Sequence, residues 1–141
     1  MKDAINAISK RVGEVTISSS LYETQSWGRA DEPDYLNQVV QVVTEMPAML
    51  VLKTILAIEK EVGRERIEKW GARTIDIDIL FYNSDTIALP DLKVPHPELH
   101  KRRFTMEPLA EIAPDFIHPD LNVNMLQLKS LVTDNLMVKK L

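Results

Sequence analysis

The sequence has no cysteine, only four glycines, and no apolar run long enough to span a membrane. Without cysteine the chain can form neither a disulfide nor a thiolate metal site. That absence is typical of a reducing compartment, and we recognise no export leader, so we expect a cytoplasmic protein. We expect no membrane and no nucleic-acid partner, because the net charge of −4 indicates no basic face for a polyanion.

The remaining composition is that of a globular protein. Hydrophobic residues make up 45% of the 141 residues and charged residues 27%. This balance can support a hydrophobic core, and disorder is not expected. We therefore expect one domain over residues 1–141. We also expect a monomer.

Hydrophobic spacing predicts the order of the elements. Apolar residues at helical spacing before Gly13 predict a helix, and alternation over 15–22 predicts a strand. After a polar loop, 24–34, a valine-rich strand over 35–46 is expected to pair antiparallel with the first. Pro47 suits a helix start and Gly63 its end. Further elements are predicted at 73–82 and 86–89 as strands, and at 105–113 and 124–131 as helices.

This order indicates an α+β fold. It contains most of the ferredoxin-like βαββαβ pattern, an antiparallel sheet with helices on one face. The first strand of that pattern is missing from the sequence.

Two aspartates stand in a run that is otherwise typical of a buried strand, Arg73-Thr74-Ile75-Asp76-Ile77-Asp78-Ile79-Leu80-Phe81-Tyr82. In a strand, residues two apart face the same side, so Asp76 and Asp78 would repel each other and lose hydration. A divalent cation would compensate, and paired carboxylates without sulfur favour Mg2+. The alternative is that both aspartates lie on a solvated strand face without metal.

Basic residues flank the aspartates on both sides: Arg64, Arg66, Lys69 and Arg73 upstream, and Lys101, Arg102 and Arg103 downstream. Guanidinium groups bind phosphate oxygens bidentately, and a metal ion neutralises charge that moves to the leaving oxygen. Together these residues indicate a polyphosphate substrate. The sequence has no Gly-x-x-x-x-Gly-Lys-Ser/Thr motif, which excludes a P-loop enzyme.

Four further residues have two interpretations each. Trp70 is either a stacking platform or an ordinary half-exposed tryptophan. His96 stands between two prolines and cannot belong to a regular helix, so we expect it on an exposed loop. There it is either a surface residue or a hydrogen-bond donor to phosphate. His100 and His118 lack zinc-ligand spacing, and we expect structural or surface roles for both.

Several segments resemble the 6-hydroxymethyl-7,8-dihydropterin pyrophosphokinase family. They are Tyr35-Leu36-Asn37, the helix end from Ile58-Glu59 to Gly63-Arg64, Trp70-Gly71-Ala72-Arg73-Thr74-Ile75-Asp76-Ile77-Asp78-Ile79, Val94-Pro95-His96, and Pro108-Leu109-Ala110-Glu111-Ile112-Ala113-Pro114. The similarity runs from the first helix to about Pro119. It implies transfer of the pyrophosphoryl group of ATP to the pterin hydroxymethyl group, with release of AMP, in folate biosynthesis.

The resemblance also implies roles for individual residues. Asp76 and Asp78 would bind two Mg2+ ions, with Arg73, Lys69 and Trp70 completing the catalytic group. The nucleotide and its phosphates would contact Glu59, Arg64, Arg73, Ile79, His96 and Arg102. The pterin would contact Thr24, Trp27, Tyr35, Asn37 and Phe104, with Tyr35 and Phe104 stacking on the ring.

The sequence departs from the family pattern at a few positions. Lys69 and Trp70 match the tip of a mobile loop that closes over the active site in the family. Lys69 stands where the family often has arginine, which keeps the charge but loses the bidentate fork. Asp91 and Lys93 differ from the usual residue types, so we assign them no contact. Members of the family begin with the missing strand, which would lie beside the aspartate strand. We therefore expect a domain that is truncated at its N-terminus, unless another segment or chain takes that place. Two other functions remain as alternatives. One is a folded but weakly active ligand-binding remnant, and the other is a different Mg2+-dependent phosphotransferase or phosphohydrolase.

Overall fold

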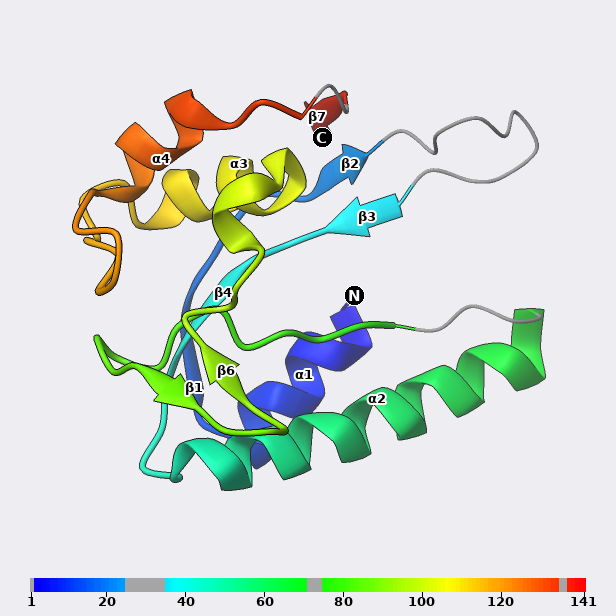
Figure 1. The fold of residues 1–141 in the computed structure, drawn as a ribbon. Coiled ribbons are helices and arrows are strands. Elements are labelled where there is room, and N and C mark those ends of the chain that lie inside the picture. The colour runs from blue at the N-terminus through cyan, green and yellow to red at the C-terminus, as the bar shows by residue number, and fades with distance from the viewer. Residues whose placement is uncertain (1, 25–34, 71–74, 135–136) are drawn as a thin grey trace.

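The computed structural model describes residues 2–24, 35–70, 75–134 and 137–141, without the side chains of residue 35 and residues 64–70. In these ranges the helices are α1 (Lys2–Arg11), α2 (Ala48–Trp70), α3 (Arg103–Ile112) and α4 (Met125–Leu131), with a short 3-10 turn, η1 (Leu99–Lys101). The strands are β1 (Glu14–Ser18), β2 (Tyr22–Thr24), β3 (Tyr35–Asn37), β4 (Val40–Val43), β5 (Ile87–Ala88), β6 (Lys93–Val94) and β7 (Val138–Lys140). The predicted α+β class is confirmed (Figure 1).

The two strands predicted near the start of the chain form a long antiparallel hairpin. β1 pairs with β4, β2 pairs with β3, and β7 adds to the other edge of β2. The first predicted strand is interrupted at Ser19 and the second at Val39. The hydroxyl of Ser19 accepts from the Val39 amide at 2.9 Å. The antiparallel pairing was therefore predicted correctly, but its continuity was not, because a side chain replaces part of the ladder.

The helices pack against two separate hydrophobic clusters. α1 and α2 contribute to one cluster, which includes Ile8, Ile55 and the fully buried Ile58. α3 and α4 form the other, which includes the fully buried Met106 and Met125. In Figure 1, α1 and α2 lie together in the lower part of the view, and α3, α4 and β7 lie together in the upper part. The expectation that the helices cover only one face is wrong, since α3 and α4 have a cluster of their own.

The helix α2 does not end at Gly63 as the sequence predicted. It continues to Trp70, through a segment rich in arginine, lysine and glutamate. These residues have high helix propensity, whereas one glycine inside a helix costs only about 1 kcal/mol. The favourable run therefore outweighs the single unfavourable residue. Lys69 and Trp70, which the resemblance places at a loop tip, lie in the last turn of this helix.

The run that carries the aspartates is not a strand in the structure. Residues 75–81 have no regular secondary structure, and β5, predicted as a returning strand, pairs with β6. The alternation expected of a strand is nevertheless present: Ile75, Ile77 and Ile79 are half-buried against the α1 and α2 cluster, while Asp76 and Asp78 are exposed. The residues have the right pattern, but a strand also needs a hydrogen-bonded neighbour.

His118 has the structural role that the sequence indicated. It is 4% exposed, and its Nδ1 accepts from the amides of Asp120 and Leu121, both at 3.1 Å. Burial lowers the pKa of His118; Asp120 opposes this shift and His100 adds to it. The ring is therefore neutral at pH 7 and carries its proton on Nε2.

His118 should make the stability of the protein depend on pH. The unfolded chain takes up a proton on this residue near pH 6.5, before the folded chain does. The free energy of unfolding should therefore fall as the pH drops below about 6.5, and this contribution should level off below the folded pKa. In His118→Asn, Oδ1 can still accept the two amides but cannot titrate. Urea unfolding between pH 5 and 7.5 should show a weaker pH dependence for this variant, and equal dependence would contradict the argument.

Candidate active site

The aspartate segment, residues 75–79, presents two carboxylates to solvent. Asp78 is 54% exposed in its side chain, and Asp76 is also exposed. Among the described residues, no lysine or arginine forms an ion pair with either aspartate. The half-buried isoleucines that alternate with the aspartates, Ile75, Ile77 and Ile79, fix the face on which both carboxylates lie. The pair is therefore open to a ligand and is not paired with a described lysine or arginine side chain.

His96 approaches the aspartate pair from the loop after β6. Its Nε2 lies 4.0 Å from Asp78 Oδ2, and its own amide donates to the carbonyl of Leu80 at 2.9 Å. Its Nδ1 accepts from the Glu98 amide at 3.1 Å, so the ring proton is on Nε2 and points to the site. In this tautomer His96 can donate a hydrogen bond to a phosphate oxygen but cannot act as a base through Nε2.

Glu59 lies behind the aspartates on α2. Its Oε2 accepts from the Ile77 amide at 2.7 Å. Burial raises the pKa of Glu59; the Ile77 amide opposes this shift, while Asp76 and Asp78 add to it. Glu59 is therefore near enough to both aspartates to sense their charge, while its Oε2 is occupied by the Ile77 amide. Sequence spacing carried no signal for the contact between Glu59 and Ile77.

Two residues predicted to bind the pterin contact each other on the hairpin. The Asn37 side-chain amide donates to the Thr24 hydroxyl at 3.0 Å, and Thr24 is 4% exposed. Thr24 pairs with Tyr35 and Asn37 with Tyr22 across β2 and β3, so Thr24 and Asn37 are diagonal neighbours on one face. The hydrogen bond fixes the Asn37 amide, and no described residue donates to the side-chain oxygen of Asn37.

Arg102 and Phe104 lie together at the start of α3. The Arg102 guanidinium carbon is 5.6 Å from the centre of the Phe104 ring, which is within the range of a cation–π contact. The structure thus joins one residue predicted to contact phosphate and one predicted to stack on the pterin.

A hydrogen-bond cluster that the sequence did not predict connects α3 to β2. Tyr22 is buried, and its hydroxyl donates to Glu111 Oε1 at 2.8 Å. Burial and this carboxylate raise the pKa of Tyr22 to about 12. Desolvation acts to raise the pKa of Glu111, but hydrogen bonds from Tyr22 and Ser20, together with Lys140, lower it overall. The cluster holds the strand that carries Thr24 against the helix that begins beside Phe104.

Several predicted site residues cannot be placed. Trp27 and Arg73 lie outside the described residues, and so do the side chains of Arg64, Lys69, Trp70 and Tyr35. Ile79, predicted near the adenosine, is half-buried against the α1 and α2 cluster. The described candidate site therefore consists of the aspartate pair with His96 and Glu59, and of the hairpin and α3 residues.

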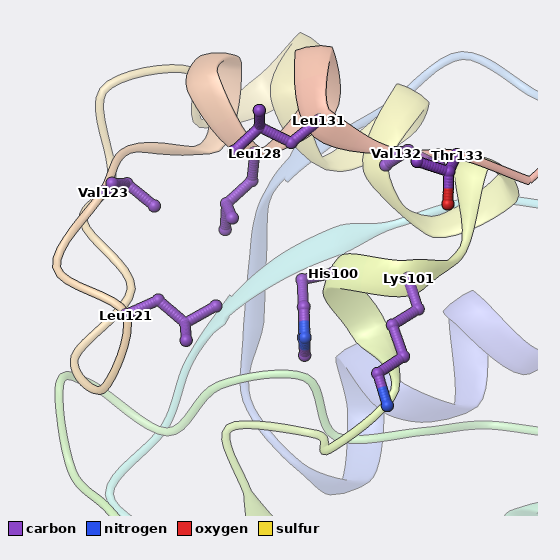
Figure 2. A pocket seen from close by; sticks show the side chains of 8 residues that line it. All are labelled: His100, Lys101, Leu121, Val123, Leu128, Leu131, Val132 and Thr133. Atoms are coloured by element: carbon purple, nitrogen blue, oxygen red, sulfur yellow. The ribbon is translucent and has the colours of Figure 1, made fainter.

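A pocket of about 410 Å³ lies elsewhere, beside α4. Figure 2 shows the side chains of His100 and Lys101 extending from one turn, with the aliphatic side chains of Leu121, Val123 and Leu128 to the left of them in the view. Its lining residues are His100, Lys101, Leu121, Val123, Leu128, Leu131, Val132 and Thr133. None of the predicted site residues is among them, and Lys101 pairs with Glu98 at 3.7 Å. The exposed aspartate surface, not this pocket, is the candidate site.

Comparison with known proteins decides the family. The family model described as 7,8-dihydro-6-hydroxymethylpterin-pyrophosphokinase matches residues 1–114. The chain belongs to this pyrophosphokinase family. The resemblance on which the site residues were assigned is therefore confirmed at the level of the family.

Curated members of the pyrophosphokinase family are similar over most of this chain. Relatives named 2-amino-4-hydroxy-6-hydroxymethyldihydropteridine pyrophosphokinase occur in Haemophilus influenzae (36% identity, 96% of this chain), Synechocystis sp. (41%, 82%) and Aquifex aeolicus (45%, 75%). The matched regions span 85%, 58% and 66% of those proteins, respectively. The match therefore covers most of the first relative and less than two thirds of the other two.

Proposed function

We propose that this chain transfers the pyrophosphoryl group of ATP to the hydroxymethyl group of 6-hydroxymethyl-7,8-dihydropterin, as a step of folate biosynthesis. The hydroxyl oxygen forms a bond to the β-phosphorus, and the bond from that phosphorus to the oxygen bridging the α-phosphorus breaks. AMP leaves, a proton is released, and the pterin diphosphate forms. We further propose that the protein acts as a monomer in the cytoplasm.

The observation that carries this proposal is the exposed pair Asp76 and Asp78, with the Nε2 proton of His96 pointing toward it. This arrangement stands in a chain of the pyrophosphokinase family. A carboxylate pair beside a hydrogen-bond donor suits a triphosphate, because a cation bound to the carboxylates and the donor can each stabilise part of its negative charge.

The donor set fits magnesium. Within the described part of the chain no group of three or more histidine, aspartate or glutamate side chains is placed to hold a metal ion, and Mg2+ usually binds one or two carboxylates, water and substrate phosphates. We propose that Asp76 and Asp78 hold two such ions. When bound, the ions would stabilise charge on the attacking and leaving oxygens. The arginines predicted around the site, Arg64, Arg73 and Arg102, would bind and orient the phosphates.

The pterin is proposed to bind between the hairpin and the start of α3. The hydrogen bond between Thr24 and Asn37 supports this, because it presents the amide of Asn37 in one orientation. A pterin offers a row of ring amide donors and acceptors, and a fixed amide discriminates against rings with another pattern. Phe104 and Tyr35 would stack on the ring, with Trp27 nearby.

We also propose that the hairpin and the aspartate segment belong to one ferredoxin-like sheet, with a further strand between β4 and residues 75–79. Val42 of β4 and the isoleucines of the aspartate segment border the same cluster, which supports a common sheet. Among the described residues, the backbone of 75–79 makes no hydrogen bond to another backbone group. An added strand would satisfy these groups.

The same unpaired backbone supports a second candidate, a protein that binds the ligands but turns over slowly. An aspartate pair on a loosely held segment would be poorly positioned for catalysis. One assay separates the candidates: incubate the protein with Mg2+, ATP and the hydroxymethyldihydropterin, and follow AMP and pterin diphosphate. AMP that appears only with the pterin supports the transferase. Binding without turnover supports the second candidate, and release of phosphate or pyrophosphate without pterin would contradict both.

A further inference from the structure

We propose that Glu59 is a positioning residue, which holds the amide of Ile77 and thereby orients Asp76 and Asp78 for the cation. The proposal rests on the proposed function for the role of the aspartates, but the contact itself does not. Glu59 comes from α2, eighteen residues earlier in the chain, and its Oε2 accepts from Ile77 N at 2.7 Å.

The contact matters because the aspartate segment has no other described anchor for its amides. Leu80, just beyond it, accepts from the His96 amide, but residues 75–79 make no backbone to backbone hydrogen bond within the described ranges. The Ile77 amide lies between the two aspartates in sequence. Ile77 is half-buried against the α1 and α2 cluster, and Asp76 and Asp78 on either side of it are exposed. Holding the Ile77 amide against α2 therefore fixes the backbone from which both aspartates project.

The acceptor for the Ile77 amide is the carboxylate of Glu59, although a negative charge near Asp76 and Asp78 is electrostatically unfavourable. Asp76 and Asp78 lie close enough to raise the pKa of Glu59. A charged acceptor makes a shorter and stronger hydrogen bond than a neutral one. Only Oε2 is used; Oε1 has no hydrogen-bond partner among the described residues. We therefore assign Glu59 the task of anchoring the segment, a task that a neutral acceptor of the same shape can also perform.

Two substitutions separate anchoring from charge. Glu59→Gln keeps an oxygen that can accept from Ile77 and removes the charge, whereas Glu59→Leu removes both at similar volume. Hydrogen exchange of the Ile77 amide, measured by NMR on the metal-free protein, should remain slow in Glu59→Gln. In Glu59→Leu it should become about tenfold faster or more, because the Ile77 amide loses its acceptor. Unchanged exchange in Glu59→Leu would overturn the proposal.

The second readout is the affinity for Mn2+, a hard ion that can replace Mg2+ as a probe, measured by electron paramagnetic resonance without substrate. Glu59→Leu should lose about tenfold in affinity or more, and Glu59→Gln should retain most of it. Equal losses in both variants would show that charge acts instead of position and would overturn the proposal.

The matched controls are Glu61→Gln and Glu61→Leu on the same helix, where Glu61 pairs with Arg11 at the surface. Neither substitution should change the exchange of the Ile77 amide or the affinity for Mn2+. Neither readout needs turnover, so a failure of the proposed function would appear separately, as absence of AMP.

Discussion

Asp78→Asn should lower the rate of pyrophosphoryl transfer by about 10³-fold or more, equivalent to about 4 kcal/mol of transition-state stabilisation. The substitution keeps the shape of the side chain and removes one of the two charges proposed to hold the ions. The side chain is 54% exposed and lies 4.0 Å from His96, so the variant should fold normally. Steady-state formation of AMP and pterin diphosphate, with circular dichroism to verify folding, checks this prediction.

The matched control for this experiment is Asp85→Asn. Asp85 is an exposed aspartate in the turn that follows the aspartate segment, and its amide donates to the carbonyl of Tyr82. The substitution makes the same chemical change without touching the proposed metal ligands, so turnover should stay close to that of the unmodified protein. Full activity of Asp78→Asn would remove the metal role proposed for this residue.

Gly13→Ala should destabilise the protein by about 3 kcal/mol, the upper part of the range for overpacking. A Cβ at Gly13 would lie 2.1 Å from the Val43 carbonyl oxygen and 2.9 Å from Thr44 Cβ. The obstacle is backbone, which cannot rotate away. Thr44 also donates to the carbonyl of Val12 at 2.7 Å, so a shift would disturb the junction of α1, β1 and β4. Urea unfolding of both proteins measures the difference.

Gly63→Ala is the natural comparison for Gly13→Ala. Gly63 lies inside α2, and no described atom comes within 4 Å of the place its Cβ would take. Alanine in a helix is favoured over glycine by about 0.5–1 kcal/mol, so this variant should be as stable as the unmodified protein or more so. If Gly13→Ala cost less than about 1 kcal/mol, the close packing of Gly13 against β4 would be refuted.

Much of the fold could be predicted because the deciding interactions are local. The helix α4 begins where Asn124 was expected to start it, and Asn124 and Gln127 form a capping box there. α1 stops just before Gly13, and α3 occupies nearly the predicted range. In each case the hydrophobic spacing and the residues at the helix ends indicate the same bounds, so contacts with distant parts of the chain are not needed to define the helix.

The incorrect predictions share a different cause. Gly63 is a local stop signal, but the charged run after it continues α2 to Trp70. Residues 75–82 have the composition and alternation of a strand, yet strand structure depends on a partner that sequence spacing does not supply. The division of the hairpin at Ser19 depends on its contact with Val39, twenty residues away.

The sequence by itself determined the chemistry: Asp76 and Asp78 on one side of an apolar run, basic residues on both flanks, and the motifs of the pyrophosphokinase family. Only the tertiary structure decided how those groups are held. It brought Glu59 to the Ile77 amide, directed the Nε2 proton of His96 toward Asp78, and joined Thr24 to Asn37. The physical reason is that residue type fixes charge and donor capacity, whereas orientation requires contacts between segments that only the folded chain brings together.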